Sequence, residues 1–107
     1  MVSFQDFKKI ELKAAKILKA EDIPGKDKLY KLKIDLGGEQ RTIVAGIKQF
    51  YSATDLEGKT IVVVANLEPA TIAGIKSEAM LLAAENIEGK YSLVTIDGNI
   101  KPGTKVE

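Results

Sequence analysis

The sequence contains no cysteine, no histidine and no tryptophan among its 107 residues. Without cysteine the chain has no disulfide, no thiolate nucleophile and no sulfur ligand for a metal. Without histidine it lacks the commonest general base near neutral pH and the commonest metal ligand. Carboxylates, lysines, serines and tyrosines remain, so catalysis is disfavoured and not excluded. We expect no catalytic residues, no metal site and no cofactor.

Long apolar runs are missing as well. A run such as Ile61–Ala65 is far shorter than the roughly 20 apolar residues of a transmembrane helix. The first residues also lack the apolar stretch of a secretory signal. We therefore expect a cytoplasmic protein without a membrane partner. The length and the absence of repeats or linker-like tracts predict a single domain over residues 1–107.

Charge is nearly balanced overall but unevenly distributed along the chain. The formal net charge is +1, yet residues 1–50 carry eleven Lys or Arg against seven Asp or Glu, and residues 51–107 carry five against eight. Such asymmetry is a hint of contact with nucleic acid or with a membrane surface. Charge alone favours the simpler interpretation that the protein has two solvated faces of different net charge, because lysine is common on any surface.

Apolar residues alternate with polar ones in the first half of the chain. Residues 29–36 place apolar side chains at every second position and Lys31, Lys33 and Asp35 between them, which is typical of a half-buried strand. The following Gly37-Gly38 pair suits a tight hairpin turn, and Arg41–Ala45 can return as the next strand. Upstream, residues 10–20 fit a helix or a strand equally.

Two helical turns and several further strands are indicated elsewhere. Ser3 and Ser52 each precede an acid by three residues, which predicts short helices at 4–9 and just after 52. Ile61–Ala65 is apolar throughout, as expected of a strand buried on both sides. The remaining predictions are strand or helix at 80–84, a strand at 91–96, an Asp97-Gly98 hairpin turn into 99–101, and a last strand at 105–106.

Five to seven short strands without a long amphipathic helix predict an all-β barrel or sandwich. The segment between Ala65 and Met80 is long for a loop, and long ordered loops are often functional. Lys31 and Lys33 share one strand face, and Arg41 lies near the start of the partner strand. The three cations suit phosphates, although a solubilising lysine face explains them as well.

Aromatic residues make up only 6% of the chain. Tyr30 and Tyr51 are candidates for stacking on bases, but Tyr30 is in the apolar phase of its strand and is expected in the core. If the ligand is nucleic acid, recognition of the shape and backbone of a folded RNA therefore fits better than base-by-base readout.

Four blocks of residues, in this order, closely resemble the tRNA-binding OB domain appended to methionyl-tRNA synthetases and its free-standing relatives. The blocks are Asp27–Tyr30, Arg41–Ile47, Val64–Pro69 and Gly74–Ala84. Each block alone is weakly specific, whereas four blocks in the right order and spacing are strong evidence, and the resemblance covers nearly the whole chain.

The resemblance implies a five-stranded OB-fold barrel with a short N-terminal helix and extra C-terminal strands. It also implies a homodimer that binds tRNA by shape and assists a synthetase, with methionyl-tRNA synthetase as a possible partner. The wider family includes a secretion-associated chaperone and assembly domains of synthetase complexes, which leaves a protein-binding module as the alternative. A carboxylate- or lysine-based enzyme is a distant third.

Candidate binding residues follow from the resemblance, namely Lys13, Lys28, Lys33, Arg41, Asn66, Ser77 and Met80. Charge and loop position add Lys48 and Lys76. The four basic residues of the first group are expected on phosphates, and the segment from Asn66 to Met80 is expected to orient the RNA.

Candidate dimer residues are Phe4, Phe7, Ile100 and Val106, which would equally serve to plug the ends of a monomeric barrel. Three positions depart from the family pattern. Lys13-Ala14-Ala15 stands for Arg-Val-Gly, Ile23-Pro24 for His-Pro, and Ala79 for a glycine before the methionine. The last change puts in doubt a left-handed backbone at Ala79.

Overall fold

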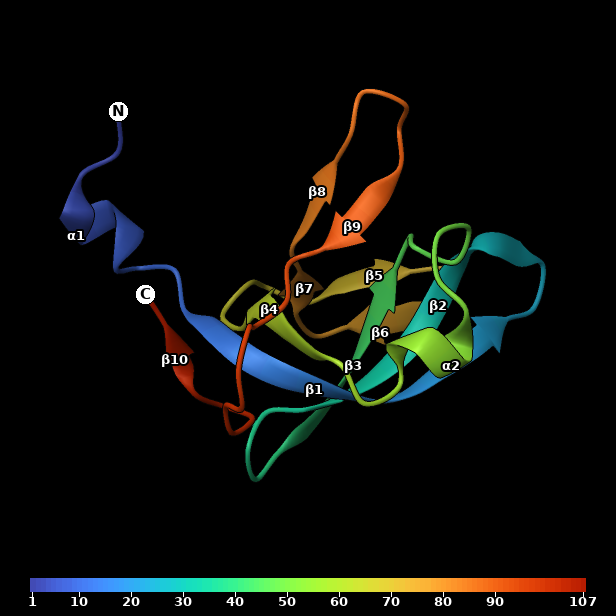
Figure 1. The fold of residues 1–107 in the computed structure, drawn as a ribbon, viewed down its shortest axis with the longest axis horizontal. Helices are drawn as coiled ribbons and strands as arrows, with labels where there is room; N and C mark the ends of the chain where they lie inside the picture. The colour runs from blue at the N-terminus through green and yellow to red at the C-terminus, as the bar shows by residue number, and fades with distance from the viewer.

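The structure, a computed structural model, describes all residues from 1 to 107 and consists of ten strands and two four-residue helices (Figure 1). The elements in chain order are α1 (Phe4–Phe7), β1 (Leu12–Ile23), β2 (Lys26–Asp35), β3 (Gln40–Ala45), α2 (Ala53–Leu56), β4 (Thr60–Val64), β5 (Ala70–Ile72), β6 (Ile75–Ser77), β7 (Met80–Leu81), β8 (Ala83–Glu85), β9 (Tyr91–Leu93) and β10 (Lys105–Val106). No helix is long and apolar enough to cross a membrane.

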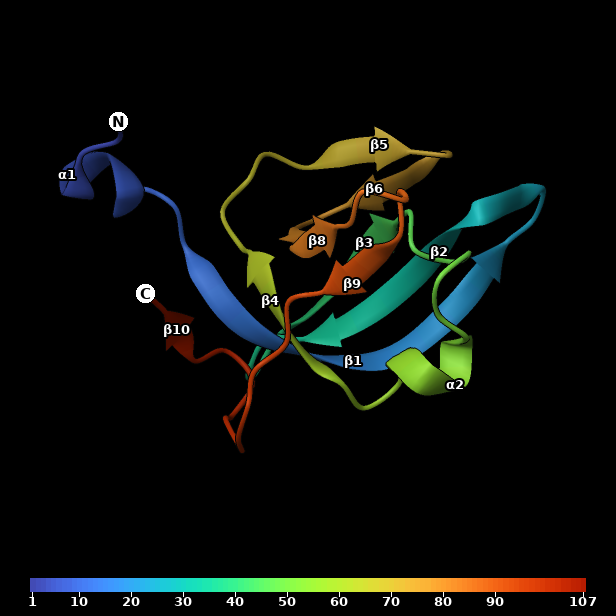
Figure 2. The ribbon, with the colours of Figure 1, turned by 45° about the horizontal axis from the view of Figure 1, so that its top comes forward.

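One long, curved strand, β1, organises the main sheet (Figure 2). The sheet has the order β3-β2-β1-β4-β7, with β10 also paired to β1, and all its pairs are antiparallel. β1 pairs with β4 over Leu12–Lys16 and with β2 from Lys16 onward. The register shifts between Ile17 and Lys19, and such an irregularity bends a strand and increases its twist. The bend lets one strand belong to both halves of the sheet.

The free edge of β3 meets the segment that leads into β7. The backbone N–H of Glu78 donates to the carbonyl of Thr42 at 2.9 Å, and the N–H of Thr42 donates to the Glu78 carboxylate at 3.1 Å. The N–H of Val44 donates to Oγ of Ser77 at 3.0 Å. Because β7 is the last strand of the order and pairs with β4, these bonds join the two ends of the sheet. The result is the predicted all-β, OB-like barrel.

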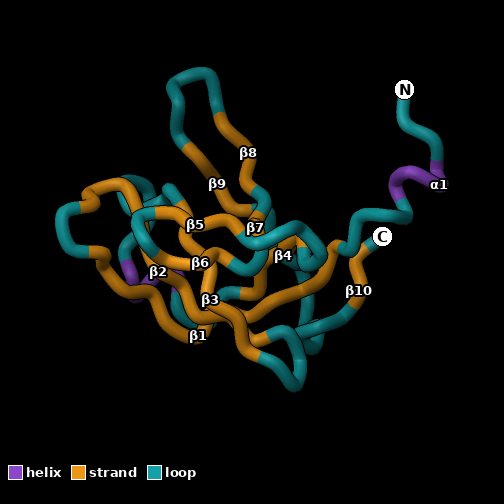
Figure 3. Tube along the Cα trace, turned by 180° about the vertical axis from the view of Figure 1, so that it is seen from behind, coloured by secondary structure: helices purple, strands orange, loops and turns teal.

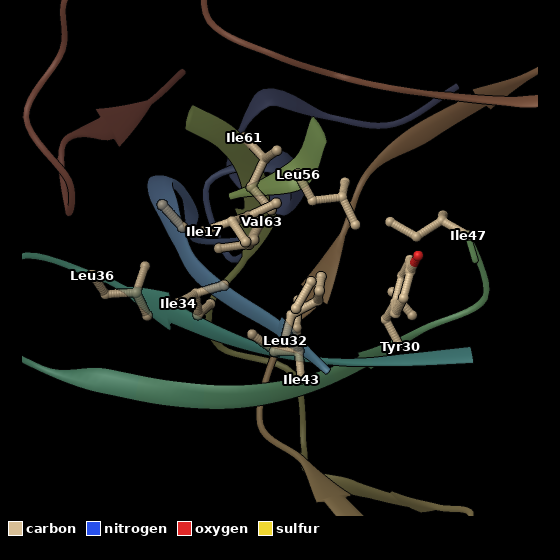
Figure 4. Packing of buried hydrophobic residues seen from close by; sticks show 14 residues of the cluster. Ile17, Tyr30, Leu32, Ile34, Leu36, Ile43, Ile47, Leu56, Ile61 and Val63 are labelled. Carbon is tan, nitrogen blue, oxygen red and sulfur yellow. The ribbon is translucent and has the colours of Figure 1, made fainter. Parts of the chain in front are cut away.

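The core lies inside this barrel (Figure 4). The predicted alternation in β2 is confirmed, since its even-numbered apolar residues, Tyr30 among them, are buried. Tyr30 also donates its hydroxyl to the carbonyl of Tyr51 at 2.8 Å, which fits a core role. The uniformly apolar run Ile61–Ala65 is buried throughout, as predicted. The largest fully buried side chains are Ile17, Leu32, Ile34, Ile43, Leu56, Ile61 and Val63.

Both predicted helix starts are confirmed. Oγ of Ser3 accepts from the N–H of Asp6 at 3.1 Å, and Oγ of Ser52 accepts from the N–H of Asp55 at 3.2 Å. The first helix ends at Phe7, two residues earlier than predicted. The two ambiguous segments are strands, because 12–20 joins β1 and 80–85 forms β7 and β8.

Two expectations about the second half of the chain are wrong. Residues 99–101 form no strand after the bend at Asp97-Gly98. The backbone bonds of Ala14 to Gly103 and Thr104 instead lead the chain directly to β10 at the edge of β1. The segment 66–80 is not a plain loop either, since β5 and β6 form a hairpin within it. Its left-handed residues are Ala73 and Gly74, so Ala79 needs no positive φ and packs in the core.

The turn between β2 and β3 is packed against the C-terminal segment at two glycines. A Cβ added at Gly37 would collide with the carbonyl oxygen of Pro102, and one added at Gly103 would collide with that of Leu36. Both glycines also have positive φ, +77° and +87°. The close approach fixes the turn after the second strand and the start of the last strand against each other.

Gly37→Ala is expected to destabilise the protein much more than Gly38→Ala. Both positions have positive φ, which costs a non-glycine residue about 1–2 kcal/mol. Only at Gly37 does the added methyl group also meet backbone, whereas nothing lies within 4 Å of a Cβ at Gly38. Urea unfolding followed by circular dichroism measures both free energies of unfolding. Equal losses in the two variants would contradict the close packing.

Candidate nucleic-acid interface

The strand register gathers four lysines on the outer side of β1 and β2. Lys33 lies directly opposite Lys19 on one side and Thr42 on the other, and Lys31 lies between Glu21 and Val44. Directly opposite residues on paired strands point to the same face of a sheet. Most of their neighbours along the strands, such as Ile17, Leu32 and Ile34, point inward and are buried. We call Lys16, Lys19, Lys31 and Lys33 the basic outer face.

The lysines of the basic outer face have no carboxylate partner within 4.0 Å, because the four ion pairs of the structure involve other cations. Asp35, opposite Lys16, is engaged by the N–H of Gly37 at 2.8 Å. Charge that is not neutralised within the protein is available to an external anion. An array of lysines on adjacent strands is suited to the phosphates of a nucleic-acid backbone.

Two of these lysines escaped the sequence analysis. Lys16 and Lys19 lie in the segment that fitted a helix or a strand equally, so their face was undefined. Lys16 also extends the basic surface, because it lines a polar depression of about 420 Å³ together with Lys101, Asn99 and Thr60. The periodicity of β1 is hidden by its register shift, which moves the outward position from even to odd residue numbers.

Arg41 does not join this face, so the expectation of a single patch of Lys31, Lys33 and Arg41 is wrong. Arg41 pairs with Ile34 and therefore points to the inner side of the sheet, at the mouth of the barrel. Its guanidinium donates to the carbonyls of Ala65 and Glu78 and is paired with Glu39 at 3.1 Å. The side chain is 21% exposed. Its contacts hold the ends of β4 and β6 to β3.

Two polar candidates are likewise engaged within the protein. Ser77 is buried, and its hydroxyl accepts from Val44 and donates to the carbonyl of Ala79 at 3.3 Å. Asn66 is exposed, but its amide donates to the carbonyl of Lys9 at 2.7 Å and accepts from the N–H of Glu11 at 2.9 Å. Asn66 thus ties the N-terminal segment to the barrel. A role of either residue in RNA binding stays a prediction.

The remaining basic candidates are dispersed. Lys28 is exposed at the start of β2, and its carbonyl accepts from the N–H of Lys48. The ammonium group of Lys48 is paired with Asp22 at 3.0 Å and lies 5.9 Å from the centre of the Tyr30 ring. Lys13 is half-buried and lies opposite Val63, outside the β1–β2 pairing. Of the three, Lys28 has the most accessible charge.

Lys76 and Met80 belong to the β5–β6 hairpin and the strand after it. Lys76 is exposed, and Met80 is 49% exposed beside an apolar groove of about 150 Å³. The groove lies between the outer side of β3 and the hairpin, and its lining is Val44, Leu67, Glu68, Ala70, Ile72, Ser77, Ala79 and Met80. Val44 is also the neighbour of Lys31, so the groove borders the basic outer face.

Three of the four candidate dimer residues are exposed. Phe4 and Phe7 lie on α1, which stands away from the barrel, and Phe4 is 73% exposed (Figure 1). Ile100 is exposed near the other end of the chain. Val106 is half-buried because it pairs with Leu12. Neither phenylalanine plugs an end of the barrel, so the alternative that these residues close a monomeric barrel is wrong for Phe4 and Phe7.

The described residues include no group of three or more Asp or Glu side chains that could hold a metal ion. An array of unpaired lysines on the outer side of an OB-like barrel is typical of a binding surface. A family model described as "Putative tRNA binding domain" matches residues 12–105. The chain belongs to this family of tRNA-binding domains.

The tRNA-binding domain is 52% identical over 98 residues to methionine–tRNA ligase of Methanocaldococcus jannaschii and 51% identical over 105 residues to that of Thermotoga maritima. The matches cover 92% and 98% of this chain, and 15% and 16% of the two ligases. The chain therefore spans about a sixth of these relatives.

Solved structures of similar length share the whole fold. The MetRS related protein from Pyrococcus horikoshii has a TM-score of 0.94 at 36% identity, with 100% of this chain and 98% of that chain covered. The chaperone CsaA from Bacillus anthracis has a TM-score of 0.90 at 31% identity, with 100% and 99% covered. The family and the OB-like fold that the residue blocks predicted are thus confirmed.

Arg41→Ala is expected to lower the free energy of unfolding by about 1–3 kcal/mol, the cost of leaving buried polar groups without a partner. The carbonyl of the buried Ala65 would lose its guanidinium donor. Lys33→Ala is the matched control. It removes a cation from the adjacent strand, and the side chain of Lys33 forms no hydrogen bond or ion pair. Chemical denaturation measures both. A destabilisation by Lys33→Ala as large as that by Arg41→Ala would contradict the assignment.

Proposed function

We propose that this chain binds tRNA through the basic outer face and catalyses no reaction itself. The carrying observation is the set of four lysines on adjacent strands that have no partner within the protein. Family membership supports tRNA as the nucleic acid, since the matched model describes a tRNA-binding domain. Residues 1–107 act as one such binding unit.

Recognition follows the shape and backbone of the RNA. The basic outer face carries lysine ammonium groups, which attract phosphates as point charges and do not read base edges. The grooves of A-form RNA also offer little sequence information to side chains at a flat surface. Lys28, at the start of β2, and Lys76, on the β5–β6 hairpin, are further exposed cations outside this face. The basic outer face is therefore expected to bind a tRNA whatever amino acid that tRNA accepts.

The domain acts as an accessory to methionyl-tRNA synthetase, by raising the local concentration of tRNA. Support comes from the relatives, in which a similar segment is part of methionine–tRNA ligases. The active form is a homodimer in which the exposed phenylalanines of α1 are covered by the second copy. Two basic outer faces in one particle present more cations to one large RNA than a single face does.

Peptide binding is the second candidate function. It is favoured by the apolar groove beside Met80, where Leu67, Ile72 and Met80 are all exposed. A structure called chaperone CsaA shares the fold over the full chain. The two candidates differ in their response to salt, because contacts in an apolar groove are not weakened by counterions as phosphate contacts are.

Binding of tRNA is expected to weaken steeply with salt, and a Lys19→Gln, Lys33→Gln double variant is expected to flatten this dependence. Each lost phosphate contact reduces the slope of log K against log salt by about one unit, hence by about two in the double variant. Fluorescence anisotropy with total tRNA at several salt concentrations measures the slope.

Lys9→Gln serves as the charge control, because Lys9 is already paired with Asp6 at 3.1 Å, next to α1 and away from the basic outer face. An unchanged slope in the double variant would place the RNA elsewhere. Salt-insensitive binding of an unfolded peptide, without measurable tRNA binding, would favour the second candidate.

Phe4→Asp is expected to convert a dimer to a folded monomer. The side chain is 73% exposed and contributes nothing to the core, so the substitution places a charge only in the surface between copies. Analytical ultracentrifugation at micromolar concentration measures the mass. Thr71→Asp on the exposed hairpin is the control with the same added charge. A monomeric mass for the unaltered protein would overturn the dimer.

A further inference from the structure

The β8–β9 hairpin projects beyond the barrel (Figure 3). Its residues also line a depression that differs chemically from the groove beside Met80 and from the depression beside Lys16. The depression, about 380 Å³, lies between this hairpin and the loop that follows β3. The rings of Phe50 and Tyr91 meet there edge to face, with their centres 5.6 Å apart and their planes at 61°. Phe50 is half-buried and Tyr91 is 37% exposed, so ring surface remains open to a ligand.

The polar lining of the depression has unused hydrogen-bonding groups. The side chains of Gln49 and Ser92 have no partner within the protein, and the amide nitrogen of Asn86 is also without an acceptor. Lys90 is the sole charged residue of the lining, and it forms no ion pair. This lining is complementary to a nucleotide. The aromatic surface can stack on the base, the amide and hydroxyl groups can hydrogen-bond to the edge of the base, and the lysine can bind the phosphate.

The depression is held in place by the core. The N–H of Leu93 donates to the hydroxyl of Tyr51 at 3.0 Å, and the carbonyl of Tyr51 accepts the hydroxyl of the buried Tyr30 at 2.8 Å. The same loop contacts β2 through the bond from Lys48 to Lys28. The depression therefore lies at the barrel end where β2 begins, and its walls are preformed.

We propose that this depression binds an unpaired nucleotide of the RNA by stacking its base on Tyr91, with Phe50 packed edge to face against that ring and Lys90 at the phosphate. The inference rests on the proposed RNA binding and adds to it a preference for single-stranded segments. The basic outer face holds the backbone of any RNA, whereas the aromatic pair requires a base that is free to leave its helix.

The test compares a short single-stranded oligoribonucleotide with a blunt-ended RNA duplex, at one salt concentration. Tyr91→Leu is expected to weaken binding of the single strand about fivefold or more, since a lost stack costs ~1 kcal/mol or above. Binding of the duplex is expected to stay unchanged. Tyr91→Phe keeps the ring and is expected to restore most of the affinity. Ile87→Ala, at the fully exposed tip of the same hairpin, is the matched control.

Direct observation of the rings gives a second readout that needs no variant. Ring protons of Phe50 and Tyr91 are expected to shift upfield in NMR spectra when the oligoribonucleotide is added. If the unaltered protein binds neither tRNA nor these two RNAs, both the proposed function and this inference fall; if it binds tRNA but not the single strand, only the inference falls. If it binds the duplex, while Tyr91→Leu leaves single-strand binding equal and the rings do not shift, only the inference falls. Ring shifts caused by a peptide and not by RNA would also overturn it.

Discussion

The contact between β3 and the Ser77–Glu78 segment is the constraint on which the rest of the fold depends. A sheet that ends at β3 would expose the N–H groups of Thr42 and Val44 and leave one side of the core open. Two side chains and one backbone group satisfy these positions at 2.9–3.1 Å. Arg41 reinforces the same junction through the carbonyls of Ala65 and Glu78. The sheet therefore surrounds Leu32, Ile34 and Ile43 on all sides.

This closure also determines which cations face solvent. Side chains on a strand alternate between the two faces, so placing Ile34 and Leu32 inside the barrel forces Lys33 and Lys31 outside. The register with β1 then brings Lys19 beside Lys33. The basic outer face is thus a consequence of core formation, and it needs no loop to position it. Because its lysines project from a rigid sheet, little conformational entropy of the backbone is lost when a polyanion binds.

Much of this arrangement was predictable from short-range patterns. The alternation in β2, the two serine caps and the apolar run in β4 each depend on neighbours within a few residues, and all three are confirmed. The face of Arg41 was not predictable, because it depends on the pairing of Arg41 with Ile34 across the hairpin. The strand at 12–20 was hidden by its register shift, and the roles of Asn66 and Ser77 depend on partners 33 to 57 residues away.

The residue blocks that carry the family resemblance act largely within the fold. The side chains of Arg41, Asn66 and Ser77 bind backbone groups of β3, of the N-terminal segment and of the residues just after β4 and β6, and Ala79 packs in the core. Motifs that build a barrel are expected in every protein that uses the barrel, whatever its ligand. This explains why one fold is shared by a MetRS related protein and by a protein called a chaperone. Under the proposed function, the residues that meet the RNA lie outside the blocks, namely Lys16, Lys19, Lys31, Lys33 and the Phe50–Tyr91 depression.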